Sequence, residues 1–194
     1  MHILVTNDDG VNAPGLLALV QALRELGKIS VLAPDRNWSG SGHVKTLDRP
    51  LRVRETVLAD GSPALASDGA PSDCVALGVM GLLADPVDLV VSGINPNANV
   101  GQDMTYSGTV TAAMEAVIAG IPGVAFSLDR PYRQQGEVEY GTAAGVARRV
   151  IQLLTGHPLP PTALFNVNIP HLPDDQIRGY RVTRQGRRIY NNEL

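Results

Sequence analysis

The stretch "HILVTNDDGVNAPGLLALVQALRELGKISVLA", residues 2–33, decides the fold. Its two ends, 2–6 and 29–33, are nearly continuous in apolar residues, as strands covered on both faces are. The segment between them carries leucines and a valine on one helical face, with Pro14 suited to the first turn and Gly27 to the C-terminal cap. A strand, a helix and a strand in succession predict two parallel strands joined by a right-handed crossover.

The same alternation continues along the chain. The pattern predicts helices over 74–83, 109–120 and 140–154, and buried strands over 88–93, 123–128 and 163–169. The stretch 51–57 alternates in polarity, as an edge strand does. We therefore expect a single α/β domain over 1–194, with a mostly parallel sheet and helices on both faces.

The C-terminal stretch "IRGYRVTRQGRRIYNNEL", residues 177–194, differs from the rest. It holds five of the 14 arginines and alternates as a hairpin does, without an obvious apolar face. We expect 175–194 to form a β-hairpin-like arm that pairs with another subunit. A solvated edge of the domain is the alternative interpretation.

Composition excludes several classes of protein. Hydrophobic residues make up 44% of the 194 residues and charged residues 18%, which is typical of a globular domain. The net charge of −3 and the pI of about 5.8 argue against a nucleic-acid groove and against a basic membrane-binding face. We therefore expect no nucleic-acid partner and no membrane partner.

The lone Cys74 allows no internal disulfide, which fits a reducing compartment. Its apolar surroundings in the sequence favour a core position over a nucleophile. The N-terminus lacks the pattern of a signal peptide, and no apolar run approaches the roughly 20 residues needed to span a bilayer. We expect the protein to be cytoplasmic.

Polar loops follow three of the predicted strands. Asp8 and Asp9 come directly after the first strand, "APDRNWSGSGH" (33–43) follows the second, and "SGINPNANVGQDMTYSGT" (92–109) ends the strand at 88–93. Because the carboxyl ends of parallel strands meet at one edge of a sheet, these loops should converge there. An irregular loop as long as the last one is usually functional.

Asp8 and Asp9 raise an electrostatic question, because adjacent carboxylates repel and a buried strand end screens them poorly. Either they splay into water as a polar turn, or a cation lies between them. Two carboxylates with hydroxyl and amide oxygens form a hard ligand set that suits Mg²⁺, Mn²⁺ or Ca²⁺. The four histidines show no metal-ligand spacing, although His43 lies inside one of the loops.

The turn Ser107-Gly108-Thr109 precedes the predicted helix 109–120. Free N–H groups and the helix dipole make a helix start an anion site, although Ser and Thr also cap helices without any ligand. Opposite a divalent cation, this turn would hold a phosphate.

Several catalytic signatures are absent from the sequence. There is no Walker A motif and no G-x-S-x-G elbow. Asn7 occupies the position at which a haloacid-dehalogenase phosphatase needs its aspartate nucleophile, and an amide cannot form an aspartyl phosphate. Without a protein nucleophile, water activated by a metal is the natural attacking group.

Four motifs together resemble the SurE family, the stationary-phase survival nucleotidases. They are "ILVTNDDGVNAPGL", "APDRNWSGSGH", "SGINPNANVGQDMTYSGTVTAAMEA" and "FNVNIP", in register from residue 2 to about residue 170. The resemblance implies a Rossmann-like fold and a metal-dependent phosphatase acting on nucleoside 5′-monophosphates, often on 3′-monophosphates and sometimes on short polyphosphate. It also implies a homodimer or homotetramer built through a C-terminal extension.

Carried over motif by motif, the resemblance implies the following roles. One divalent cation would be held by Asp8, Asp9, Ser39 and Asn95, with the acidic pair also catalytic. The phosphate-contacting residues would be Asn99, Ser107, Gly108 and Thr109.

Two departures from the family pattern matter. The family usually continues beyond the point where this chain stops, which leaves the oligomeric arrangement open. Trp38 precedes Ser39 where smaller or charged residues are common, and it either stacks on a base or packs under the loop. A non-catalytic module that binds a metal and a nucleotide is the alternative function.

Overall fold

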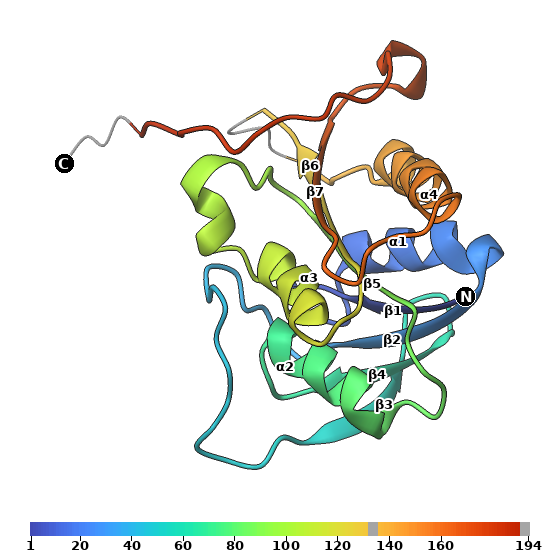
Figure 1. Cartoon of the computed structure of the whole chain (residues 1–194), viewed down its shortest axis with the longest axis vertical. Helices are drawn as coiled ribbons and strands as arrows, with labels where there is room; N and C mark the ends of the chain where they lie inside the picture. The colour runs from blue at the N-terminus through green and yellow to red at the C-terminus, as the bar shows by residue number, and fades with distance from the viewer. Residues whose placement is uncertain (132–135, 191–194) are drawn as a thin grey trace.

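The computed structural model describes residues 1–131 and 136–190. A seven-stranded sheet in the order β3-β4-β2-β1-β5-β6-β7 lies between two layers of helices (Figure 1). The strands are β1 (His2–Thr6), β2 (Lys28–Pro34), β3 (Val53–Val57), β4 (Pro63–Ser67), β5 (Leu89–Asn95), β6 (Gly123–Asp129) and β7 (Leu164–Pro170). Every neighbouring pair is parallel except β3 and β4. The mostly parallel α/β sheet expected from the sequence is confirmed.

Helices cover both faces of the sheet, as expected. The α-helices are α1 (Pro14–Leu23), α2 (Pro71–Leu77), α3 (Gly108–Ile118) and α4 (Gly141–Thr155). Short helical turns are η1 (Arg24–Leu26), η2 (Gly78–Leu82), η3 (Gly101–Thr105) and η4 (Asp174–Gln176). Helices α1 and α4 pack together on one face, and α2 and α3 on the other (Figure 1).

The first strand shows why its sequence is continuously apolar. Ile3 and Val5 belong to the core under α1 and α4, whereas Leu4 belongs to the core under α2 and α3. All three side chains have no exposed surface. A strand buried on both faces needs apolar residues at both alternating positions.

The region 51–67 differs in part from expectation. The edge strand expected over 51–57 is present as β3, which lies at the end of the sheet and pairs antiparallel with β4. Strand β4 itself is missed by sequence reasoning. Its residues "PALAS" begin with proline and are rich in alanine, a weak strand former, so burial between β2 and β3 determines the structure here.

Helix α2 begins at Pro71, three residues before the expected start, because Asp73 holds its first turn by accepting a hydrogen bond from the amide of Ala70 at 2.9 Å. Cys74 lies in this helix with no exposed surface, in the same core as Leu4. Burial raises the pKa of its thiol. The expected core position of Cys74 is confirmed.

The C-terminal hairpin expected from the sequence is not present in the described residues 177–190. Within 177–190 the chain forms no strand, and most of it is exposed, with Val182 fully so. Its polar groups bond instead to the loop around η3, so local alternation did not lead to strand pairing. Residues 191–194 of the expected arm lie outside the described residues. None of the helices within 1–131 and 136–190 has the length and apolar character needed to cross a bilayer.

Candidate metal centre beside the first strand

The candidate site lies where the strand order changes direction. Strand β1 pairs with β2 on one side and with β5 on the other, so the loops after β1, β2 and β5 begin at one edge of the sheet. Such a switch point is the usual ligand crevice of an open α/β sheet. The loop after β1 carries Asp8 and Asp9, the loop after β2 carries Ser39, and β5 ends at Asn95.

The turn after β1 is fixed by its own side chains and by the next loop. Asn7 is buried, and its side chain donates to the carbonyl of Gly10 at 3.0 Å and accepts from the Gly10 amide at 3.1 Å. The amide of Trp38 donates to the carbonyl of Asp8 at 2.7 Å, which ties the loop after β2 to the acidic pair. Gly10 has a φ of +102°, a conformation that favours glycine.

Asp8 is held by the first turn of α3. Its carboxylate accepts a hydrogen bond from Oγ1 of Thr109 at 2.5 Å and further bonds from the amides of Gly108 and Thr109. Burial raises the pKa of Asp8, and these bonds oppose the rise. The helix start expected to face an anion therefore faces the carboxyl group of Asp8.

Asp9 lies beside Asp8 and is hydrogen-bonded to the side chain of Ser39. Burial and the charge of Asp8 raise the pKa of Asp9 to about 7, whereas a hydrogen bond with the Ser39 side chain lowers it. Within 1–131 and 136–190, neither carboxylate forms an ion pair with a basic side chain. One buried and one half-buried carboxylate side by side, with this deficit of positive charge, fit a bound cation.

The other oxygen donors are neutral. In the described part of the chain, no three His, Cys, Asp or Glu side chains cluster to hold a metal, so hydroxyl and amide oxygens would complete the set. Asn95 uses its amide nitrogen to donate to the carbonyl of Asn97 at 2.5 Å, which orients the side chain and leaves its oxygen available to a cation. The donors are all hard oxygens, which suit Mg²⁺ and Mn²⁺.

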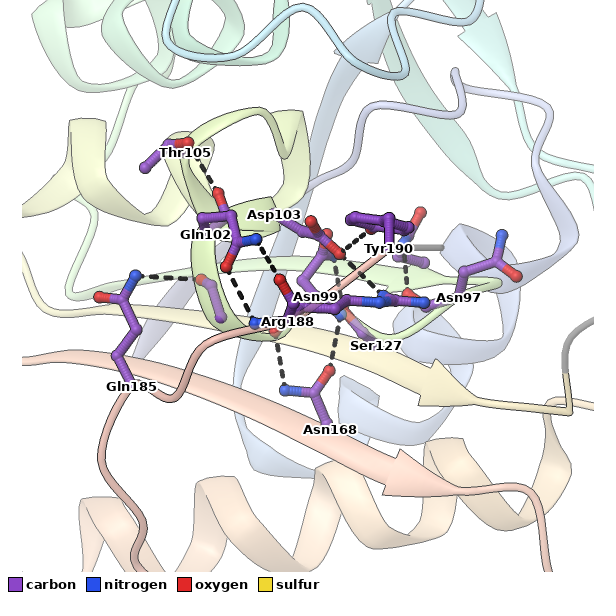
Figure 2. Close-up of polar contacts among 12 residues, drawn as sticks. Asn97, Asn99, Gln102, Asp103, Thr105, Ser127, Asn168, Gln185, Arg188 and Tyr190 are labelled. Atoms are coloured by element: carbon purple, nitrogen blue, oxygen red, sulfur yellow. Dashed lines mark hydrogen bonds and ion pairs between the residues drawn. The ribbon is translucent and has the colours of Figure 1, made fainter. Parts of the chain in front are cut away.

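The structure gives Asn99 a role in building the loop. Its amide side chain donates to Oγ of Ser127 at 2.8 Å (Figure 2). Its backbone amide donates to Asn168 at 2.8 Å, and its carbonyl accepts from Asn166 and Asn168. Asn99 therefore links the loop to β6 and β7, and a phosphate contact from it stays a prediction. Asn166 and Asn168 lie within the motif "FNVNIP" but were assigned no role from the sequence, although two asparagines at alternate positions of an apolar strand were the signal.

Ser107 is the N-cap of α3. Its hydroxyl accepts a hydrogen bond from the amide of Val110 at 3.1 Å, and its side chain is buried. Ser107 therefore caps the helix, which is the alternative to an anion site considered from the sequence.

The loop that carries Ser39 is braced against α3. Glu115 is buried, and its two carboxylate oxygens contact Nε2 of His43 at 2.8 Å and Nζ of Lys45 at 2.7 Å. Thr111 donates from Oγ1 to the carbonyl of Gly42 at 3.0 Å. Helix α3 thus positions the Asp8 side of the site with its first turn and the Ser39 loop with its middle. These contacts define a structural role for His43.

Two aromatic side chains belong to the same region. Trp38 is half-buried, and the guanidinium of Arg36 lies 4.8 Å from the centre of its ring, so one of its faces is covered. Tyr140 packs against Gly15, and burial together with the charge of Asp9 raises its pKa to about 12. Sequence reasoning missed Tyr140. Its place at the start of the helix that follows the strand at 123–128 was the available signal.

Known proteins are similar in sequence across the region that builds this site. The family model described as "Survival protein SurE" matches residues 3–192. The chain belongs to the SurE family. This membership confirms the resemblance seen in the four sequence motifs.

Individual SurE proteins are similar to this chain in sequence and in structure. The protein named 5′-nucleotidase SurE from Chloroflexus aggregans is 52% identical over 194 residues, which cover 100% of this chain and 76% of that protein. Its namesake from Herpetosiphon aurantiacus is 50% identical over 194 residues, covering 100% of this chain and 75% of that protein. The crystal structure of the SurE protein from Aquifex aeolicus matches with a TM-score of 0.87 at 42% identity, over 98% of this chain and 75% of that one.

Proposed function

We propose that the chain is a phosphomonoesterase that hydrolyses nucleoside 5′-monophosphates to nucleoside and phosphate. The observation that carries the proposal is the adjacent pair of buried Asp8 and half-buried Asp9, which forms no ion pair with a basic side chain within 1–131 and 136–190. SurE relatives named 5′-nucleotidase, at 52% and 50% identity, support the choice of substrate.

One divalent cation, Mg²⁺ or Mn²⁺, fits this pair, and Ca²⁺ fits it in a crystal. We infer that the ligands are the carboxylates of Asp8 and Asp9, the hydroxyl of Ser39 and the amide oxygen of Asn95. When bound, such a cation lowers the pKa of a water molecule and offsets negative charge on the phosphoryl group.

The side chains of the protein orient the reaction. Thr109 and the amides at the start of α3 fix the carboxylate of Asp8, and Ser39 fixes that of Asp9. We place the phosphate of the substrate on the side of Asn99 and of the turn formed by Ser107, Gly108 and Thr109. Burial of Asp8 keeps competing water away from its carboxylate, which strengthens its attraction for a cation.

Membership of the SurE family also supports wider expectations. We infer that 3′-monophosphates and short polyphosphate are additional substrates, and that the protein acts in the cytoplasm. We infer a homodimer or homotetramer in which residues 175–194 contribute to the contact between subunits. Light scattering of the purified chain tests the oligomeric state, and phosphate release from each substrate tests the activities.

The deciding experiment measures phosphate release from AMP and GMP, first with EDTA and then with added Mg²⁺ or Mn²⁺, beside the Asp8→Asn variant. We expect release that needs the metal and disappears in the variant, because Asp8→Asn removes one of two adjacent negative charges. No release from a folded chain that still binds the cation would overturn the proposal. The chain would then be a metal- and nucleotide-binding module without turnover.

A further inference from the structure

The C-terminal strap, defined as residues 185–190, lies along η3 in the loop 96–107 (Figure 2). Gln102 bonds to both backbone polar groups of Arg188: its Oε1 accepts from the Arg188 N–H at 3.0 Å, and its Nε2 donates to the Arg188 carbonyl. Gln185 donates from Nε2 to the carbonyl of Gly101 at 3.0 Å. Side-chain amides therefore fix the backbone of both segments.

An acidic side chain at the centre of this contact binds two strap residues. Oδ2 of Asp103 lies 2.8 Å from Nη1 of Arg188 and 2.5 Å from the hydroxyl of Tyr190. The Arg188 guanidinium also lies 5.0 Å from the centre of the Tyr190 ring. The side chain of Asp103 is only 19% exposed, so these charge-assisted bonds are partly shielded from water.

The two backbones approach too closely for a side chain between them. Gly101 has a φ of +58°, and a β-carbon built on it would lie 2.9 Å from the amide nitrogen of Arg188. A glycine at this position is therefore needed for the strap to dock.

The loop that receives the strap leads directly into the site. Near one end, Asn99 is bonded to Ser127, Asn166 and Asn168 of the sheet. At the other end, the Tyr106 carbonyl accepts from the amide of Gly42 at 3.0 Å. The next residues begin α3 and hold Asp8. Hydrogen bonds and a short stretch of chain therefore connect η3 to the turn on which we place the phosphate.

We propose that Asp103 and Arg188 are positioning residues: through them the C-terminal strap fixes the loop 96–107 and sets the affinity of the site for its phosphate-bearing substrate. The kinetic part of this inference rests on the proposed function. Polar contacts hold the strap, and its one aliphatic side chain, Ile189, is 78% exposed, so few apolar contacts oppose its detachment. The loop is ordered when the strap is docked and loosens when it leaves.

The structural test measures hydrogen exchange of the amides at 100–107 in the full chain. We expect Arg188→Ala to speed their exchange by about tenfold, the equivalent of one lost charged hydrogen bond. Arg187→Ala is the matched control, because Arg187 is adjacent, exposed and equally charged. Unchanged exchange in Arg188→Ala, or an equal increase in Arg187→Ala, would overturn the proposal.

The functional test separates KM from kcat for AMP with Mg²⁺. We expect Arg188→Ala and Asp103→Asn to raise KM by about fivefold with kcat within about twofold, since the acidic pair is left in place. Arg188→Lys, which keeps the positive charge beside Asp103, should recover most of the loss. A fall in kcat at constant KM, or no recovery by lysine, contradicts the positioning role. If the wild-type chain releases no phosphate at all, the proposed function fails, and the exchange measurement still decides whether the strap fixes the loop.

Discussion

Gly108 and Asp8 are in direct contact across two elements of the fold. A β-carbon built on Gly108 would lie 2.6 Å from Cβ of Asp8 and 3.0 Å from its Oδ2. The first residue of α3 is therefore a glycine for reasons of space, since its φ is not in the left-handed region. This contact lets the helix amides reach the carboxylate of Asp8.

We expect Gly108→Ala to weaken Mg²⁺ or Mn²⁺ binding on the order of tenfold, because the added methyl group must push Asp8 out of position. Isothermal titration calorimetry measures this change. Gly141→Ala is the matched control: Gly141 is also the first residue of a helix, and a β-carbon there meets nothing within 4 Å. Equal affinities in the two variants would show that the contact is not important for the site.

Thr109→Val removes the hydroxyl that donates to Asp8 and keeps the shape of the side chain. We expect a loss in cation affinity of about tenfold, since a hydrogen bond to a charged group contributes about 1.5 kcal/mol or more. Thr109→Ser should keep most of the affinity, because the donor is retained. If valine and serine bind the cation equally well, the hydroxyl does not orient the carboxylate.

The raised pKa of Asp9 makes cation binding dependent on pH. With a pKa of about 7, Asp9 of the metal-free protein carries a proton at lower pH, and the cation must displace it. We expect Mn²⁺ affinity to fall by about tenfold per pH unit below pH 7 and to level off above it. Calorimetry across this range tests the slope. Ser39→Ala should move the midpoint upward, because the bond that lowers the pKa is lost; an affinity independent of pH contradicts the assignment.

The same shift affects the stability of the metal-free protein. The pKa of Asp9 in the folded protein is raised above its ordinary value of 3.8. The stabilisation of the folded state by protonated Asp9 is therefore fully present below pH 3.8 and is lost as pH rises through about 7. We therefore expect the free energy of unfolding of the metal-free chain to contain a component that falls between about pH 4 and 7. Urea unfolding with EDTA measures it, and Asp9→Asn should remove this component. An identical pH profile in Asp9→Asn would exclude Asp9 as its origin.

Glu115 braces the loop after β2 through His43 and Lys45. Glu115→Ala leaves both basic groups without this partner. We expect it to lower the free energy of unfolding by about 1–2 kcal/mol. The carboxylate is buried, which makes its bonds stronger, whereas the two basic side chains are partly exposed, which limits the loss. Limited proteolysis should also cut within 36–49 more readily. Glu55→Ala on the exposed edge strand is the control, and equal losses in both variants would argue against the brace.

The part of the site that follows the strands could be predicted from the sequence. Parallel strands bring their carboxyl ends together, so the loops with Asp8, Ser39 and Asn95 had to begin at one edge of the sheet. The contact between Thr109 and Asp8 was not predicted. It depends on how closely α3 approaches the end of β1, which the packing of small residues such as Gly108 determines.

Segments without a strong local pattern were harder to predict. Strand β4 is short and rich in alanine, and only its place between β2 and β3 makes it a strand. The stretch 177–190 has strand-like alternation but no strand partner, so side-chain bonds to η3 determine its course. In both segments long-range contacts outweighed local preference.

The burial of Cys74 makes the fold able to report on its own opening. A thiol with no exposed surface and a raised pKa reacts slowly with an alkylating reagent while α2 stays packed on the sheet. Because the chain has one cysteine, every labelled molecule reports the same event. The labelling rate at Cys74 therefore measures how often the core beneath α2 and α3 becomes exposed, and no additional cysteine has to be introduced into the protein.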